Sequence, residues 1–178
     1  NANTTGADNT AVGDSALLAN TTAAGNTAVG YGAGDAITTG GTNAAFGVDA
    51  LGVNITGVEN TAIGAYTLAA HLVDATIAIG TQALNANTTG THNTALGYNA
   101  LLLNTTGGSN TAIGKAALDA NTTASYGTAV GYGSLSANTT GAENVSVGSA
   151  SLDANTTGGY NTALGANSLG ANTTADHN

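Results

Sequence analysis

The stretch NTAIGKAALDANTT, residues 110–123, contains Lys115. The chain has no other lysine and no arginine. Nearly the same phrase recurs as NTAVGDSALLANTT from Asn9, NTALGYNALLLNTT from Asn93 and NTALGANSLGANTT from Asn161. A phrase that returns at a fixed interval indicates a repeat protein, in which each copy is one structural unit stacked on the next.

The glycine that closes each NTA[VIL]G motif defines the period. Successive glycines are separated by seventeen residues in eight intervals and by sixteen in one. The unit is N-T-A-V-G-x-x-A-L-x-A-N-T-T-G-x-x, and its residues are numbered as repeat positions 1 to 17. The glycines at position 5 are Gly13, Gly30, Gly47, Gly64, Gly80, Gly97, Gly114, Gly131, Gly148 and Gly165.

The composition separates this chain from a disordered polar tract. It has 178 residues with 27 Gly, no Pro, no Cys and only 6% charged residues, but 42% are apolar and recur on a strict schedule. Such a schedule indicates a packed repeat. We expect residues 1–178 to form a single array, with an irregular turn at 60–76, and to be a segment of a longer fibre.

The charge balance excludes several classes of partner. One Lys or Arg against ten acids gives a net charge of −9. Nucleic-acid binding depends on many cationic side chains, so no nucleic-acid partner is expected. No apolar run approaches the roughly 20 residues of a membrane helix, so no membrane insertion is expected either.

The repeat predicts an all-β fold. Gly at positions 5 and 15, with β-branched residues at 2, 4, 13 and 14, would make a poor helix. Short strands at positions 1–4 and about 8–13, with Gly and Asn at the corners, fit better. Stacked copies then form a parallel β-solenoid of ten 17-residue turns. The absence of proline agrees with an uninterrupted ladder.

Columns of like residues indicate which side chains face inward. Position 4 is never polar, and position 9 is Leu in every turn except the second, which has Gly34. Both columns are therefore predicted to form the core, with the threonines of position 2 on the same inward face. Small residues at positions 3 and 8 predict close contact with another backbone, at or near a contact between chains. Variable residues at position 6, from Asp14 to Ala166, indicate exposure to solvent.

Two residue types have specific predicted roles. Gly in all ten turns at position 5 indicates a positive φ or a bend too tight for a Cβ atom. Asn at positions 1 and 12 predicts amide ladders between turns.

The turn at 60–76 departs from the pattern, since one residue is missing and HLVD, residues 71–74, replaces NTTG. We expect a shortened corner with added apolar packing. His71 has no second metal ligand at a useful spacing, so no metal site is predicted.

The sequence predicts no enzyme. Its histidines are His71, His92 and His177, there is no Cys, and no Ser/His/Asp grouping, HExxH motif or phosphate loop occurs. No catalytic, cofactor-binding or metal residues and no cofactor are therefore assigned. Tyr31, Tyr98 and Tyr132 share position 6, where they either pack against neighbours or stack on sugar rings.

The NTT phrase also matches the N-glycosylation sequon. Either each turn carries one glycan, or these asparagines and threonines only stabilise the corner of the turn ("corner chemistry") and carry no glycan. The NTT asparagines are Asn3, Asn20, Asn87, Asn104, Asn121, Asn138, Asn155 and Asn172; Asn54, in the sequon Asn-Ile-Thr, shares their column, and Asn144, in Asn-Val-Ser, lies outside it.

These motifs resemble known surface fibres. NTAVGYGAG (26–34), NTAIGKAAL (110–118) and NVSVGSASL (144–152) resemble the head repeats of trimeric autotransporter adhesins, and NTALGYNALLLNTTGGSNTAIG (93–114) is similar to repeats of phage tail fibres. The resemblance covers nearly the whole chain and implies parallel β-roll chains in a trimeric fibre, extracellular, on the cell surface or on a virion. The seventeen-residue unit is longer than that of the adhesin heads, and their coiled-coil stalk, membrane anchor and C-terminal chaperone have no counterpart.

The leading functional hypothesis is a fibre shaft or head segment, whose partners are copies of itself and a cell-surface glycan bound through a tip outside this segment. A self-assembling extracellular filament is one alternative. An ice-binding β-solenoid is another, because regular threonine columns suit an ordered water surface. Neighbours in a strand point to opposite faces, so only one threonine of each TT pair faces outward. The pairs are 21–22, 38–39, 88–89, 105–106, 122–123, 139–140, 156–157 and 173–174.

Overall fold

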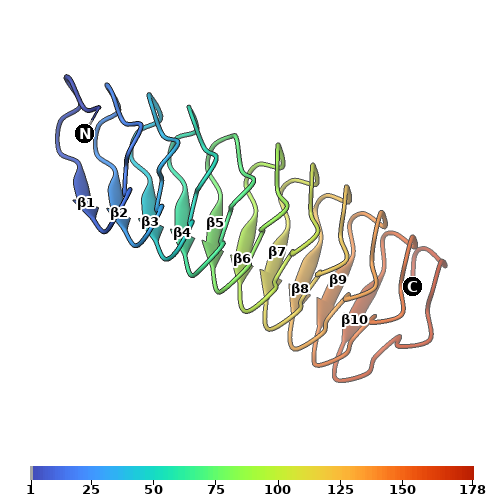
Figure 1. The fold of residues 1–178 in the computed structure, drawn as a ribbon. Coiled ribbons are helices and arrows are strands. Elements are labelled where there is room, and N and C mark those ends of the chain that lie inside the picture. Colours follow the sequence, from blue (N-terminus) through green and yellow to red (C-terminus); the bar gives the residue numbers. More distant parts are fainter. Residues whose placement is uncertain (1) are drawn as a thin grey trace.

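A computed structural model describes residues 2–178 and shows one continuous coil of stacked turns (Figure 1). Each turn contributes one three-residue strand, and the strands form a single parallel sheet in chain order. The strands are β1 (Thr10–Val12), β2 (Thr27–Val29), β3 (Ala44–Phe46), β4 (Thr61–Ile63), β5 (Ile77–Ile79), β6 (Thr94–Leu96), β7 (Thr111–Ile113), β8 (Thr128–Val130), β9 (Val145–Val147) and β10 (Thr162–Leu164). The predicted parallel β-solenoid with one repeat per turn is confirmed.

The register of the sheet follows the sequence period. Thr94 in β6 lies opposite Thr111 in β7, seventeen residues later. Between β4 and β5 the interval is sixteen, because Thr61 lies opposite Ile77. The backbone N–H of Thr111 donates to the carbonyl of Gly127 at 2.8 Å, which shows how each turn bonds to the next. Every strand residue therefore stacks on its counterpart in the neighbouring turns.

Only positions 2–4 of each repeat form a strand. The second predicted strand, at about positions 8–13, is wrong: this part of the chain is a series of tight turns. Leu118, at position 9, has a φ of 52° and Ala116, at position 7, has a φ of 56°. These left-handed conformations, unusual for residues other than Gly, bend the chain back within a single repeat. The chain therefore curves too sharply at positions 8–13 to form a second strand in each turn.

The glycine of position 5 sits at the corner that follows each strand. Gly114 has a φ of +131°, and a Cβ atom added there would lie 2.5 Å from the carbonyl oxygen of Gly131 in the next turn. Such a contact is far below van der Waals distance, and the φ value also disfavours other residues. Both predicted reasons for glycine, a positive φ and a lack of space, therefore apply.

The inward face of the sheet is the reverse of the predicted one. Position 3 points inward, and Ala112 and its counterparts in β2 to β10 are at most 2% exposed. Position 4 points outward, as shown by Leu96 at 44% and Ile113 at 37% exposure. Positions 2 and 4 do share a face, as predicted, but it is the outer one. The coil is too narrow for bulky side chains from the strand, since the leucines of position 9 already fill it from the opposite wall.

Small residues at position 8 are also interior. Ala117 is fully buried, so positions 3 and 8 pack inside one coil and do not form a contact between chains. The prediction for position 9 is confirmed: Leu51, Leu101 and Leu152 are fully buried in one core cluster. Arginine in place of Ala112 or Ala117 would consequently unfold the coil itself.

The irregular turn lacks the residue of position 14. The side-chain amide of Asn60 donates to the carbonyl of Val73 at 2.8 Å, and in the regular turn before it Asn43 donates to Gly57 at position 15. Val73 therefore occupies position 15 directly after Leu72 at position 13. The expected added apolar packing is wrong, because Leu72 is 44% exposed and the interior place is taken by His71, which is fully buried.

Candidate interaction surface

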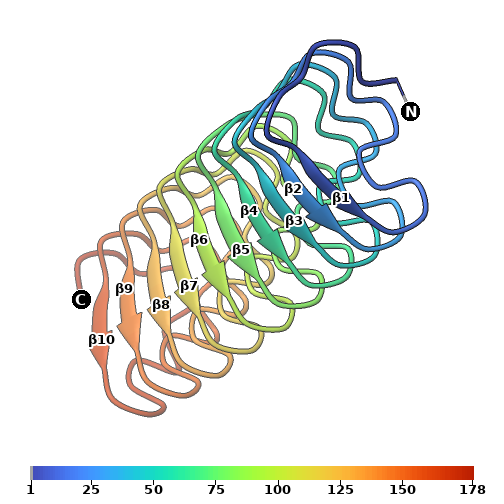
Figure 2. The same cartoon turned by 90° about the vertical axis from the view of Figure 1, so that its left-hand side faces the viewer.

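Figure 2 shows the strands side by side in one sheet along the coil. The side chains of positions 2 and 4 from all ten strands form a continuous strip on the outer face of this sheet. Position 4 is Val, Ile, Leu or Phe throughout, and position 2 is Thr in seven strands. None of these twenty residues is charged, although the chain carries ten acids. The exposed apolar side chains include Phe46, Ile63 and Leu96, at 38%, 39% and 44%. Position 4 is thus an unbroken apolar column within an uncharged strip, and an extended exposed apolar surface of this kind is typical of an interaction site.

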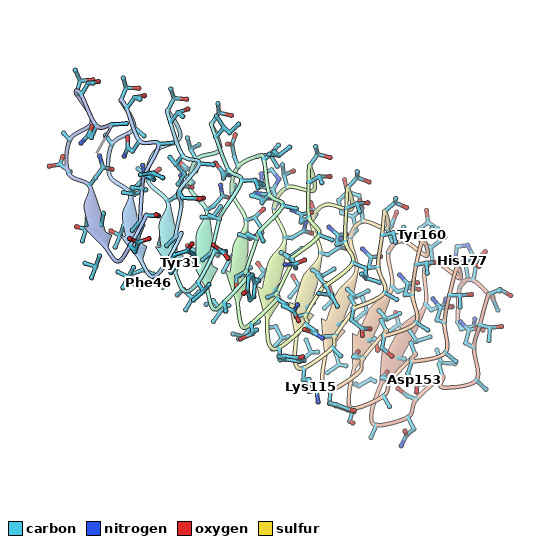
Figure 3. All side chains as sticks on the ribbon, viewed as in Figure 1. Tyr31, Phe46, Lys115, Asp153, Tyr160 and His177 are labelled. Atoms are coloured by element: carbon cyan, nitrogen blue, oxygen red, sulfur yellow. The ribbon has the colours of Figure 1, made fainter. Side chains whose placement is uncertain are left out.

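Beside this strip, position 6 forms a second exposed column at the corner after each strand. Tyr31, Tyr98 and Tyr132 are 59%, 49% and 60% exposed. Lys115 occupies the turn between Tyr98 and Tyr132, and its Nζ lies 5.9 Å and 5.8 Å from the two ring centroids. The lysine is labelled at the edge of the coil in Figure 3. The repeat places the tyrosines in one column, but their contact with Lys115 becomes visible only in the structure.

The asparagines of position 12 form an amide ladder inside the coil, as predicted. The Nδ2 of Asn104 donates to the Oδ1 of Asn87 at 2.8 Å and to the carbonyl of Gly107 at 2.9 Å. Asn121 repeats the amide bond to Asn104 at 2.7 Å. Both amide protons of Asn104 and of Asn121 are thereby engaged, which allows these polar groups to remain in the interior.

The asparagines of position 1 bond mainly to backbone. The Oδ1 of Asn110 accepts from the N–H of Gly127 at 2.8 Å, and its Nδ2 donates to the carbonyl of Ala124 at 2.9 Å. Each side chain therefore ties its own turn to the corner of the next. Together the two asparagine columns fill part of the interior with polar bonds between turns, and the apolar packing by positions 2 and 4 that the repeat pattern predicted does not occur there.

His71 takes the place of the position-12 asparagine in the irregular turn and contacts an asparagine of each column. The Oδ1 of Asn60 accepts from the backbone N–H of Thr76 and lies 3.1 Å from His71 Nε2, so Nε2 carries the proton. Nδ1 then accepts from the Nδ2 of Asn87 at 2.8 Å. Burial lowers the pKa of His71 to about 4, because the interior withholds solvation from the imidazolium. The histidine is a neutral structural link, and no group of three potential metal-ligating side chains occurs within residues 2–178.

The second turn interrupts the position-12 ladder with Ile37. Gly34 at position 9 has no side chain, and the Cδ1 of Ile37 lies 2.9 Å from where its Cβ would be. Ile37 therefore fills the space of the missing leucine. The buried amides of Asn20 and Asn54, on either side, have no hydrogen-bond partner among the described residues.

Most of the sequons are interior in the folded chain, whereas Asn3 is exposed and Asn172 is half-buried. Asn20, Asn87, Asn121 and Asn155 are at most 1% exposed, and Asn144, outside that column, is fully buried. A glycan on such a side chain would be incompatible with this fold, which supports the interpretation as corner chemistry.

The paired threonines are divided as predicted between two environments. At position 13 the hydroxyl of Thr105 donates to the carbonyl of Thr122 at 3.0 Å, so it is engaged within the coil. At position 14 Thr106 is exposed, but this column is broken where the irregular turn lacks the residue. The TT pairs therefore do not form the uninterrupted outward array that ice binding by these residues would require.

Comparison with known protein families, with curated proteins and with solved structures gives no match. Within the described chain, no helix has the length and apolar character needed to cross a bilayer.

Proposed function

We propose that the chain is a non-catalytic structural segment of a fibre displayed outside the cell or on a virion. In this proposal copies lie side by side and cover one another's outer sheet faces. The observation that carries it is the uncharged strip of positions 2 and 4, in which position 4 is apolar in every turn. The resemblance to β-roll head repeats favours three copies, with a receptor-binding tip outside this segment.

The distribution of charge supports lateral packing through this strip. The acids lie at other repeat positions, as with Asp14 at position 6, Asp119 at position 10 and Glu143 at position 17. Like charges repel copies that approach through those surfaces. Burying Val, Ile and Leu of position 4 gains about 25 cal/mol for each Å² removed from water, and this gain repeats in every turn.

Sedimentation velocity tests the proposal. The unmodified chain should sediment as an oligomer, and Ile113→Glu should dissociate it, because a carboxylate would be buried without a partner. Circular dichroism should show that this variant keeps its β-structure, since Ile113 packs no core. Thr123→Glu, at exposed position 14, is the matched control and should leave the oligomer intact.

Three outcomes would count against lateral packing. The unmodified chain would be monomeric at all concentrations, or Ile113→Glu would sediment like the unmodified chain, or it would lose its fold. A continuous series of growing species would instead favour the self-assembling filament.

Ice binding is a second candidate, now on the strip itself. Thr94, Thr111 and Thr128 stand in register at position 2 of successive strands, next to the aliphatic column. A straight array of hydroxyl and methyl groups suits ordered water. Ala44, Ile77 and Val145 interrupt it. Thermal hysteresis in a monomer, abolished by Thr111→Tyr, would establish this function in place of the fibre.

A further inference from the structure

We propose that Tyr98, Lys115 and Tyr132 form a binding site for an oligosaccharide that carries one acidic sugar between neutral ones. The site occupies position 6 of three consecutive turns, outside the strands. It therefore stands independently of the proposed lateral packing through positions 2 and 4.

The three side chains form a short linear platform along the coil axis. The Nζ of Lys115 is almost equidistant from the rings of Tyr98 and Tyr132, at 5.9 Å and 5.8 Å from their centroids. Both distances are within the range of a cation–π contact, which holds the ammonium between the rings. The tyrosines are two turns apart, about 9.6 Å if each turn rises by the ~4.8 Å spacing of strands.

All three side chains are accessible to a ligand. Tyr98 and Tyr132 are 49% and 60% exposed, and Lys115 is exposed. The position-6 residues of the turns on either side are Thr81 and Ser149, so no acid of this column lies beside the platform. Lys115 is the only Lys or Arg in a chain of net charge −9, so the platform is where an anionic ligand can contact a lysine or arginine side chain.

The chemistry of the platform matches a sugar chain. The apolar C–H face of a pyranose packs on an aromatic ring, and the tyrosine hydroxyl bonds to sugar hydroxyls. The ammonium of Lys115 supplies charge-assisted hydrogen bonds to a carboxylate. An extended oligosaccharide laid along the axis advances by a length similar to one turn per sugar. Neutral sugars then lie at Tyr98 and Tyr132, and the acidic sugar lies at Lys115.

Other anions fit less well. A nucleic acid or a densely charged polysaccharide would be repelled by the net charge of −9 and would find only one cation. A simple anion on one exposed lysine gains little free energy. A single carboxylate combined with two stacking contacts is the arrangement that uses all three side chains.

Tyr31 provides a matched control within the same column. It is 59% exposed at position 6, but its neighbours along the column are Asp14 and Val48. It therefore offers the same ring without a cation. Figure 3 shows Tyr31 well away from Lys115 along the coil.

Binding is measured by NMR titration with two probes: a trisaccharide with a central glucuronic acid, and the neutral trisaccharide with glucose in its place. The acidic probe should bind about tenfold more tightly, which corresponds to about 1.4 kcal/mol. Lys115→Ala should remove this difference. Tyr98→Ala and Tyr132→Ala should each weaken binding severalfold, and Tyr31→Ala should have no effect.

The variants change exposed side chains, so circular dichroism should show the fold unchanged. The proposal is overturned if neither probe binds, if both bind equally, or if Lys115→Ala leaves the preference intact. It is also overturned if Tyr31→Ala weakens binding as much as Tyr98→Ala does. Tighter binding of an aspartate-containing tripeptide than of the acidic sugar would assign the platform to a peptide instead.

Discussion

At the scale of single residues, polar side chains inside the coil bond to the same partners in turn after turn. His71 fits into this scheme because its two ring nitrogens reach Asn60 and Asn87, one from each asparagine column. A proton on Nδ1 would face the amide N–H of Asn87. The amide cannot simply rotate, because its Oδ1 accepts from Asn104 and its Nδ2 donates to Gly90. The site therefore requires a neutral imidazole.

A dependence of stability on pH follows from this requirement. His71 takes up a proton near pH 6.5 in the unfolded chain and only near pH 4 in the folded chain. The folded state binds fewer protons in this window, so stability is complete above about pH 6.5 and falls by about 3 kcal/mol as the pH drops to 4. His71→Asn should remove this loss, as measured by urea unfolding at several pH values.

The control is His92→Asn, because His92 is exposed. Burial raises the pKa of Asp35 and Asp119, which acts in the opposite direction, but both variants retain these acids. Equal pH profiles for His71→Asn and the unmodified chain would contradict the assigned role.

The second turn allows a test of compensation between residues. Gly34→Leu alone should destabilise by overpacking against Ile37, and Ile37→Asn alone should leave a void. The double variant restores the pattern of the other turns and supplies partners for the amides of Asn20 and Asn54. It should exceed the unmodified chain by about 1–3 kcal/mol of unfolding free energy. Additive effects in the thermodynamic cycle would show that the two positions are not coupled.

At the scale of the repeat element, each strand ends at a corner that only glycine can occupy. Gly114→Val introduces a side chain against the backbone of Gly131 and into a φ of +131°. We expect a loss of more than about 3 kcal/mol of unfolding free energy. Lys115→Ala, one residue later and exposed, should change it by less than about 0.5 kcal/mol. Thermal melts that shift equally for both would contradict this account of the corner.

Several features of the element could be predicted from the sequence because they repeat. The period, the first strand of the unit, the glycine corner, the buried leucine of position 9 and the asparagine ladder of position 12 all correspond to invariant or nearly invariant columns. The alternation of side chains along a strand also predicted correctly that positions 2 and 4 lie on the same face of the sheet. It could not decide whether they face inward, because that depends on the width of the coil.

The width of the coil depends on backbone conformations that cannot be predicted from the sequence. The sequence does not reveal that a leucine such as Leu118 has a φ near +50°, because glycine is the residue expected at such a φ. These left-handed residues narrow the coil until only a small strand residue, Ala or Ser, fits at position 3 opposite the leucines. A bulky column such as Ile113 is then displaced to the outside. The same effect made the candidate interface visible only in the structure, on positions 2 and 4.

At the scale of the whole molecule, the straight stack of ten strands makes each local feature a line along the coil (Figure 1). The leucines and amides form lines inside, and the aliphatic residues of position 4 form a line outside. The central claim is that this outer line is covered by other copies of the chain. Because the chain has no Cys, the reactivity of a single introduced cysteine measures the accessibility of the line in which it lies, with no reaction from other thiols.

The most direct measurement is the maleimide reaction rate of three single-cysteine variants over a range of concentrations. Ala112→Cys should be protected throughout; Ser146 shows that this interior position accepts one further heavy atom. Thr123→Cys should react throughout. Ile113→Cys should be protected in the assembled protein and reactive when dilution separates the copies. If Ile113→Cys reacts as fast as Thr123→Cys at every concentration, the outer face is uncovered and the central claim is wrong.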